Sequence, residues 1–590
     1  MTDLNGIDVT FRICGAAGDG SLAAGSFLNR AAARMGYHIM NIDLYPAEIR
    51  GFGKSVAHTR ISDSPVQTPG SLVDCLVSLN DLHAITELDT LREGAVILYD
   101  SKPPNYMEED EAIAGFVEPG MIGYGVPLGE LSSIATKSAR SRNIVALGAL
   151  TGIFHLPSVF LRDAISDRFA RKSAVIAEMN LRAFDLGLEY ATTELVKADG
   201  IDFRERVPGA SDDVVVVSGN EAVARGCLDA GVRLYAGYPI TPATKIMEIL
   251  AKELPKQGGV VVQTEDEISA IGHVIGGGFA GKRSVTATSG PGLSLMTEFL
   301  NLAVMAEVPV VVVNGQRGGP STGLPTKTEQ SDLNIAVFGG SGDSPRPVIA
   351  PADVTECYEL TVKAFEVAEA FQTPVILLTD LFLGNRVEDI TWPEGDLGEW
   401  GIYQNRIVEP LGAEDYKRFA ITTDGVSPRS IPGMPGLHYP ATGLEHDERG
   451  FPEYSPENHL RMTEKRYRKF ETLLETWPAP IPEGAAGELD VGIISWGSTI
   501  GTAREALELL QDSELQAGGL FPRLIWPLHS GALMAFSNRS RHLIVAEGNH
   551  SGQFANMVEA LVCREVIRIT EIPAGPIPSA RIIEVAGGLN

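Results

Sequence analysis

The 590-residue sequence predicts an α/β protein built from three α/β domains, and three observations carry this prediction. Short runs rich in β-branched residues recur along the chain and alternate with stretches of helical periodicity. Gly-rich or polar turns follow several of these runs, as is common at the carboxyl ends of strands in parallel sheets. Two segments without clear periodicity separate the three units. By length alone, such a chain has room for about four domains.

The first unit, residues 1–195, begins with the strand-like run VTFRICG, the turn AAGDG and an Ala-rich helical stretch. Further apolar runs, HIMNIDLY, DCLVSLN and AVILYD, are separated by helical stretches, which predicts a parallel α/β domain. Residues 196–210 are polar and charged and contain Gly and Pro, so we expect a linker there.

The second unit, residues 211–385, contains the runs VVVVSG, VVVQT, SVTATSG, VPVVVVNG and TPVILLTD. Near-continuous β-branched runs are typical of strands that are covered on both faces. Residues 386–487 show periodicity only in NHLRMTEKRYRKFETLLETW, which predicts an irregular connector with one charged helix. The third unit, residues 488–590, opens with a strand and a helix in DVGIISWGSTIGTAREALELL.

Composition excludes several classes of function. The chain has 48 Lys and Arg against 76 Asp and Glu, a net charge of −28, which disfavours nucleic acid or an anionic membrane as partner. No apolar run approaches the ~18 residues of a membrane span, and no signal peptide is evident at the N-terminus. We therefore expect a cytoplasmic protein.

Five cysteines are scattered along the chain, without a CxxC or another common zinc or iron–sulfur spacing. This pattern predicts thiols in the cores of a protein from a reducing compartment, with no metal held by this chain. The cysteines are Cys14, Cys75, Cys227, Cys357 and Cys563.

The first turn with functional potential is Gly15-x-x-Gly18-x-Gly20, between a strand and a helix. Glycines there allow a phosphate to approach the free N–H groups at the helix start. However, the spacing is not that of the usual dinucleotide motif, and Asp19 places an anion where the phosphate would lie. A plain glycine turn is therefore the favoured interpretation.

The second turn is Tyr238-Pro239-Ile240-Thr241-Pro242, before the helical run ATKIMEILAKEL. Pro242 suits the first helical position and Thr241 the N-cap, so Thr241 could serve only to cap the helix. The alternative is that the Thr241 hydroxyl and the nearby amides face a substrate carboxylate.

Three acidic residues, Glu265, Asp266 and Glu267, precede the small apolar helix ISAIGHVIGGGFAG. All three could be solvated charges that the helix dipole favours. Glu267 leads directly into the apolar face, however, where burial penalises a charged carboxylate. We therefore prefer one buried acid, Glu267, beside two exposed ones.

Three more turns follow predicted strands. Thr288–Gly292 and Gln316–Gly323 are rich in glycine, as are ligand-binding turns of open α/β sheets. Arg317 in the second of these could clamp a carboxylate with both of its terminal nitrogens, or could be an ordinary surface arginine. The third turn, Glu547–Gln553, is polar.

Taken in order, YPITP, TEDEISAIG, TATSGPG and NGQRGGPSTG resemble the pyrimidine-binding domain of 2-oxoacid:ferredoxin oxidoreductases, which are thiamine diphosphate enzymes. WGST at 496–499 and EGNHSGQ at 547–553 resemble the family's transketolase C-terminal-like domain. GAAGDG, RGFGKS at 50–55 and RISD at 60–63 resemble its gamma domain. A gamma domain ahead of alpha, together with ATGLEHDERG at 441–450, is most similar to the alpha subunit of 2-oxoglutarate:ferredoxin oxidoreductases.

The resemblance implies oxidative decarboxylation of a 2-oxoacid, with 2-oxoglutarate giving succinyl-CoA and CO2 as the best match. It assigns catalysis to Glu267, which would hydrogen-bond N1′ of the cofactor's aminopyrimidine, and substrate binding to Thr241 and Arg317. Cofactor binding is assigned to a further group of residues, namely Tyr238, Pro239, Ser289 and Gly290 along with Glu267.

The resemblance also implies a partner. The family's beta subunit carries the diphosphate- and Mg²⁺-binding motif and a 4Fe–4S cluster, so we expect thiamine diphosphate to be shared between the subunits of a dimer of alpha–beta heterodimers. Ferredoxin would accept the electrons, and coenzyme A would be a cosubstrate on the side capped by the gamma domain.

Two alternatives stay open. The substrate could be pyruvate or a branched-chain or aryl 2-oxoacid, or the chain could be a non-catalytic scaffold or adaptor. The presence of Thr241, Glu267 and Arg317 together counts against the scaffold.

Overall fold

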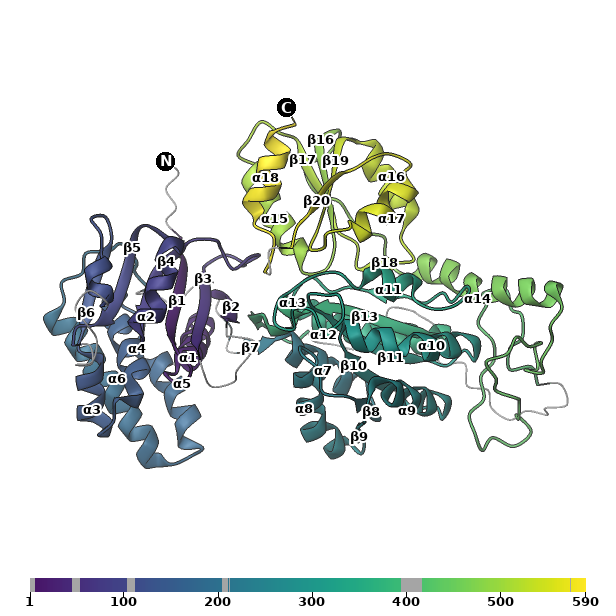
Figure 1. Cartoon of the computed structure of the whole chain (residues 1–590), viewed down its shortest axis with the longest axis horizontal. Helices are drawn as coiled ribbons and strands as arrows, with labels where there is room; N and C mark the ends of the chain where they lie inside the picture. Colours follow the sequence, from purple (N-terminus) through teal and green to yellow (C-terminus); the bar gives the residue numbers. More distant parts are fainter. Residues whose placement is uncertain are drawn as a thin grey trace. The chain divides into compact units, whose positions relative to one another are not determined.

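The computed structural model describes residues 6–44, 53–102, 112–203, 211, 213–393, 416–572 and 575–589 (Figure 1). The chain divides into two compact units. One comprises Met1–Val217 with Arg386–Trp392, and the other comprises Ser218–Asn385 with Pro393–Asn590. The predicted α/β class is confirmed in both units, because each contains parallel-paired strands with helices packed on them.

The first unit is organised around one eight-stranded sheet of order β6-β5-β4-β1-β3-β2-β14-β7. Strand β3 lies between β1 and β2 and is antiparallel to both, so this sheet is mixed. The prediction of a parallel sheet holds for β1, β4, β5 and β6 and is wrong for the other pairs that the structure describes. The strands are β1 (Asp8–Ala16), β2 (His38–Leu44), β3 (Lys54–Ser62), β4 (Val73–Ser78), β5 (Leu91–Asp100), β6 (Ile122–Val126), β7 (Val215–Ser218) and β14 (Val387–Ile390).

Strand β14 reaches this sheet from the segment that was expected to be an irregular connector. Its Val387 pairs with Asn41 of β2. Asp389 accepts hydrogen bonds from Ile39 N at 2.6 Å and from His38 Nδ1 at 2.9 Å, and this contact raises the pKa of His38. Strand β7, expected to open the second domain, also lies in this sheet, at its edge beyond β14.

The helices of the first unit pack closely where glycines replace larger side chains. A Cβ on Gly148 would lie 2.0 Å from Phe184 O, and one on Gly187 would lie 2.1 Å from Val145 O, so α4 and α6 approach backbone to backbone. The helices are α1 (Ser21–Arg34), α2 (Asp81–Ala84), α3 (Leu128–Thr136), α4 (Arg142–Ile153), α5 (Ser158–Ala170) and α6 (Ala174–Glu194).

The second unit contains a seven-stranded sheet of order β18-β12-β13-β11-β10-β8-β9. Strands β10, β11 and β13 are buried throughout, as predicted, whereas β9 is an edge strand whose Val260 is 57% exposed. The strands are β8 (Leu234–Gly237), β9 (Val260–Gln263), β10 (Ser284–Thr288), β11 (Val310–Gln316), β12 (Val348–Ile349), β13 (Pro374–Asp380) and β18 (Leu524–Trp526).

Helices flank this sheet (Figure 1), with α7 packed on α12 and α8, and α9 packed on α10. The helices are α7 (Gly219–Asp229), α8 (Thr244–Glu253), α9 (Glu267–Phe279), α10 (Gly290–Met305), α11 (Leu333–Phe338), α12 (Val354–Phe371) and α13 (Leu381–Asn385).

A five-stranded sheet of order β15-β17-β16-β19-β20 completes the second unit. Its apolar residues form one core cluster with those of the seven-stranded sheet, so the two sheets share a core. The elements are β15 (Glu483–Gly484), β16 (Leu489–Ser495), β17 (Ala517–Leu520), β19 (Ser540–Glu547), β20 (Ile567–Thr570), α15 (Thr499–Leu510), α16 (Ser530–Asn538), α17 (Gln553–Val562) and α18 (Ser579–Gly587).

The charged helix of the connector is confirmed as α14 (Pro456–Thr476). Two of its lysines are buried and paired with Glu307, just beyond the end of α10; Lys465 makes one ion pair, and Lys469 Nζ lies 2.6 Å from Glu307 Oε2. These cations hold the pKa of Glu307 well below its usual range in spite of its burial. The charges on this helix thus anchor it to the core.

No helix in the described ranges has the length and apolar character needed to cross a bilayer. Within the same ranges, no three His, Cys, Asp or Glu side chains are placed so that they could hold a metal ion together. Four of the five cysteines are buried, as predicted, but Cys563 is exposed.

Candidate active site

The turns singled out in the sequence lie together at the carboxyl ends of the strands of the seven-stranded sheet. Strands β8, β10 and β11 are parallel neighbours, so their carboxyl ends lie side by side. Tyr238 follows β8, Ser289 follows β10 and Arg317 follows β11. This is the edge at which open α/β sheets bind ligands.

Glu267 is the first residue of α9 and is buried, with 6% of its surface exposed. Asp266 occupies the N-cap, where its carboxylate accepts a hydrogen bond from Ser269 N at 2.7 Å, and Glu265 is exposed. The prediction of one buried acid is confirmed for Glu267, and Glu265 is exposed as expected, whereas Asp266 is half-buried because its carboxylate caps the helix.

The start of α10 leaves room for the Glu267 carboxylate. A Cβ on Gly292 would lie 2.6 Å from Glu267 Oε1 and 2.0 Å from Thr288 Oγ1, well inside normal contact distance. Only glycine allows the α10 backbone to pass this close. The motif TSGPG therefore shapes the space around the acid.

Arg317 is buried, so the alternative of a surface arginine is wrong. Its Nη1 donates a hydrogen bond to Thr241 O at 2.7 Å, which ties the turn after β11 to the turn after β8. Burial lowers the pKa of Arg317, while the nearby carboxylates of Asp332 and Glu267 act in the opposite direction. The guanidinium is thus a desolvated cation close to the buried acid.

Asp332 is a member of this group that sequence reasoning missed. Its Oδ2 accepts a hydrogen bond from Asn314 Nδ2 at 2.9 Å, and its backbone N donates to Gln316 Oε1 at 3.0 Å. Burial raises the pKa of Asp332 to about 6, against an opposing effect of Arg317. Asn314 and Gln316 are buried polar residues at the end of an otherwise apolar strand, and that pattern was the available signal.

The turn after β8 differs from its prediction. Helix α8 begins at Thr244 with Ala243 at the N-cap, so Thr241 does not cap the helix and Pro242 is not its first residue. Pro242 instead packs on β11, where a Cβ on Gly315 would lie 2.8 Å from its Cγ. Contacts with β11 therefore hold this turn in place.

The remaining predicted residues line the same edge. Tyr238 is 42% exposed, and Pro239 and Thr241 are partly exposed. Ser289 is fully buried at the N-cap of α10, and Gly290 lies against Asp332, since a Cβ there would be 2.7 Å from Asp332 Oδ1.

Three buried polar atoms at this edge have no hydrogen-bond partner among the residues that the structure describes: Ser289 Oγ, Asn314 Oδ1 and Arg317 Nε. Leaving such an atom unpaired costs about 1–3 kcal/mol. A ligand with several hydrogen-bonding groups would satisfy them. The residues present therefore fit a polar heterocycle such as the aminopyrimidine of thiamine diphosphate, with Glu267 and Ser289 as its hydrogen-bonding groups.

The two C-terminal motifs join the two sheets of this unit through Gln330. Gln330 Nε2 donates to Trp496 O at 3.0 Å, and its Oε1 accepts from Thr499 Oγ1 at 2.7 Å and from Gly548 N at 2.8 Å. Gln330 lies two residues before Asp332. WGST and EGNHSGQ thus support the segment that carries Asp332.

Glu547 is the buried anchor of the second motif. It accepts hydrogen bonds from Phe554 N at 3.0 Å and Ala555 N at 2.9 Å, at the start of α17. Burial raises the pKa of Glu547 even though these bonds oppose the shift. The carboxylate of Glu547 thus has a structural role, because it holds the start of α17 against the end of β19.

In the first unit, the turn Gly15–Gly20 is closed by its own acidic residue. Asp19 Oδ2 accepts a hydrogen bond from Ala16 N at 2.8 Å, and Asp19 Oδ1 lies 3.0 Å from Arg142 Nη2. These contacts support the plain glycine turn. Arg50, Gly51 and Phe52 of the RGFGKS motif lie outside the described residues.

Comparison with known proteins defines the class of this fold and site. The family model for the thiamine diphosphate-binding part of pyruvate flavodoxin/ferredoxin oxidoreductases matches residues 225–465, which include Glu267 and Arg317. The model for pyruvate ferredoxin/flavodoxin oxidoreductase matches residues 10–190. The chain thus combines two oxidoreductase domains, one of them described as thiamine diphosphate-binding.

Relatives that match most of the chain define the class of protein more narrowly. An alpha subunit of a 2-oxoacid:ferredoxin oxidoreductase from Aeropyrum pernix is 30% identical, over 94% of this chain and 93% of its own. The 2-oxoglutarate oxidoreductase subunit KorA of Mycobacterium tuberculosis is 31% identical, over 96% and 89%. The chain belongs to the family of 2-oxoacid:ferredoxin oxidoreductase alpha subunits.

A solved structure agrees with this assignment. A chain of the 2-oxoglutarate:ferredoxin oxidoreductase from Magnetococcus marinus, with 2-oxoglutarate, coenzyme A and succinyl-CoA bound, is 38% identical and superposes with a TM-score of 0.92. The match covers 99% of both chains. The three-domain α/β architecture is therefore that of the family.

Proposed function

We propose that this chain is the alpha subunit, with a fused gamma domain, of an enzyme that oxidatively decarboxylates 2-oxoglutarate to succinyl-CoA and CO2 and passes the electrons to ferredoxin. The observation that carries the proposal is the convergence of Glu267, Arg317 and the Thr241 turn at one sheet edge. The substrate rests on the relatives that are named for 2-oxoglutarate, including the Magnetococcus marinus enzyme.

Glu267 is proposed as the catalytic acid. Thiamine diphosphate, when bound, supplies the electron sink for decarboxylation. Glu267 would hydrogen-bond N1′ of the aminopyrimidine, and its buried position at the start of α9 would keep water away from this contact. Ser289, Gly290, Tyr238 and Pro239 line the adjoining wall.

Arg317 and Thr241 are proposed to bind the 2-oxoacid. A guanidinium can hold a carboxylate through two parallel hydrogen bonds, and the buried Arg317 Nε has no partner among the described residues. The bond from Arg317 to Thr241 O fixes the guanidinium against the turn that carries the Thr241 hydroxyl. Both groups can therefore meet the same end of the substrate.

The remaining parts of the proposal concern the complex. A beta subunit is proposed to supply Mg²⁺, the diphosphate site and the 4Fe–4S cluster in a dimer of alpha–beta heterodimers, and coenzyme A to accept the acyl group. The cysteines, which form no disulfide in the described structure, fit a reducing cytoplasm. Relatives named only as 2-oxoacid oxidoreductases keep other 2-oxoacids open as the alternative substrate.

The test is a co-expressed alpha–beta complex assayed with 2-oxoglutarate, pyruvate, and branched-chain and aryl 2-oxoacids, with coenzyme A and a low-potential viologen. We expect the highest kcat/KM with 2-oxoglutarate. Glu267→Ala should lower the rate by ~10²–10⁴-fold, whereas Glu265→Ala, which removes the exposed neighbouring acid, should not.

Two results would contradict the proposal. A higher kcat/KM for another 2-oxoacid would overturn the substrate while keeping the reaction. Activity of Glu267→Ala within a few-fold of the wild type would remove Glu267 from catalysis, and a wild-type complex with no 2-oxoacid activity would favour the scaffold.

A further inference from the structure

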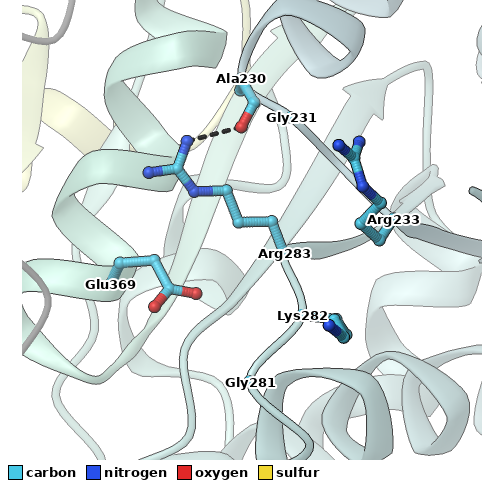
Figure 2. A pocket seen from close by; sticks show the side chains of 7 residues that line it. All are labelled: Ala230, Gly231, Arg233, Gly281, Lys282, Arg283 and Glu369. Carbon is cyan, nitrogen blue, oxygen red and sulfur yellow. Dashed lines mark hydrogen bonds between the residues drawn. The ribbon is translucent and has the colours of Figure 1, made fainter. Parts of the chain in front are cut away.

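A pocket of about 330 Å³ opens at the amino ends of strands of the seven-stranded sheet (Figure 2). It is formed by the loops that lead into β8 and β10, Ala230–Arg233 and Gly281–Arg283, together with Glu369 of α12. These loops precede the first residues of parallel strands, whereas the active-site turns follow the last ones. The pocket is therefore separate from the site of Glu267.

Three cations gather in this pocket: Arg233, Lys282 and Arg283. Because β8 and β10 are neighbours, the backbone N of Arg233 donates to Arg283 O at 2.9 Å, and each arginine immediately precedes one of these two strands. Arg283 Nη1 donates to Ala230 O at 2.5 Å, the contact drawn in Figure 2, which holds its guanidinium over the pocket.

The positive charge of the pocket is not balanced within the described residues. None of the three cations forms an ion pair with a carboxylate there, although the chain carries 76 acidic residues. The one acid in the lining, Glu369, is already paired with Arg429, whose Nη1 lies 2.9 Å from its Oε2. Like charges that lie close together repel one another.

The helix dipole explains only part of this grouping of positive charges in the pocket. The two loops follow the C-termini of α7 and α9, where one cation each is favourable. The dipole does not explain why three cations line one concave site in a chain with a net charge of −28. An anion in the pocket would remove the repulsion.

We propose that this pocket binds a phosphate-bearing small molecule, with a diphosphate held by Arg233, Lys282 and Arg283. Arginine suits this ligand because its planar fork matches two phosphate oxygens at once. A volume of about 330 Å³ lies in the range of small-molecule sites. A protein partner would need a broader surface with an apolar centre, whereas this lining is charged and glycine-rich.

The test is calorimetric titration of the full chain, purified with its partner, with inorganic pyrophosphate. Excess thiamine diphosphate keeps the cofactor's own diphosphate site filled. We expect the double variant Arg233→Gln/Lys282→Gln to bind roughly tenfold more weakly or worse. The matched control Lys245→Gln/Lys252→Gln removes the same charge from exposed positions of α8 and should bind as the wild type does.

A second arm identifies the form of the ligand. ADP that displaces pyrophosphate and binds more tightly supports a nucleotide, and ADP that fails to compete supports free pyrophosphate. The proposal is overturned if pyrophosphate does not bind, or binds equally to both double variants. It is also overturned if the Arg233→Gln/Lys282→Gln variant loses its partner chain during purification, because the cluster is then a protein interface.

Discussion

Replacing Gly292 with alanine tests whether the close approach of α10 sets the position of Glu267. The added Cβ would lie 2.6 Å from Glu267 Oε1, and ordinary contact begins at 3.4 Å, so the carboxylate must retreat by about 0.8 Å. Thr288 Oγ1, only 2.0 Å from the same Cβ, must move further, and both groups are buried. The change thus displaces the proposed catalytic acid without removing it.

The expected effects on activity and stability differ in size. A displacement of about 1 Å at a reacting group costs ~100-fold in rate. Overpacking destabilises by about 1–3 kcal/mol, but alanine in a helix gains about 1 kcal/mol over glycine. We therefore expect Gly292→Ala to lose ~100-fold in kcat while its free energy of unfolding falls by no more than ~2 kcal/mol.

The assay is 2-oxoglutarate-dependent viologen reduction by the complex, together with urea unfolding of each variant. Gly276→Ala is the matched control, because Gly276 lies in α9 and nothing is within 4 Å of a Cβ placed there. The control should be as active as the wild type and slightly more stable. Wild-type kcat in Gly292→Ala would refute the reasoning, because Glu267 could then shift without consequence.

Three further predictions follow from the site. Arg317→Lys keeps the charge but loses the planar fork, so kcat/KM for the 2-oxoacid should fall by ~10–100-fold in steady-state kinetics; an unchanged value would remove Arg317 from substrate binding. Gln330→Ala deletes the side-chain bonds to Trp496, Thr499 and Gly548, and the free energy of unfolding should fall by ~2–4 kcal/mol in urea; a loss below about 0.5 kcal/mol would contradict the role of Gln330 in joining the two sheets. The folded-state pKa of Asp332, about 6, exceeds the ordinary 3.8, so the folded protein binds more protons between these values. Stability should therefore fall as pH rises through that window, by up to ~3 kcal/mol from this group, and Asp332→Asn should flatten the profile; equal slopes in both proteins would contradict the assignment.

Local sequence patterns were sufficient to predict several features of the candidate active site. The acidic triplet before an apolar helix indicated that Glu267 is buried, and the structure confirms it, because burial of the first turn follows from the helix's own apolar face. Arg317 could not be assigned in this way. Its burial depends on Thr241, which is distant in the chain and adjacent only once β8 and β11 lie in one sheet.

Pairing between distant segments also explains what sequence reasoning missed. Strand β14 completes the first sheet from beyond the second domain, and β18 joins the seven-stranded sheet from the C-terminal region, because an open sheet edge accepts any strand of suitable register. Asp332 lacks a motif of its own, and its pKa is raised chiefly by burial in the folded chain, against the opposing hydrogen bond from Asn314.

The sequence by itself determined the α/β class, the order of the glycine-rich turns and the membership of the family, because periodicity and short motifs are local properties of the chain. Only the tertiary structure decided which charges meet. The fold brings Arg317, Asp332 and Glu267 together at the carboxyl ends of the strands of one sheet. It places Arg233, Lys282 and Arg283 at the amino ends of strands in the same sheet. The reason is that parallel strands place residues from distant turns side by side. Burial of these charged groups, which alters their interactions, occurs only in the folded chain.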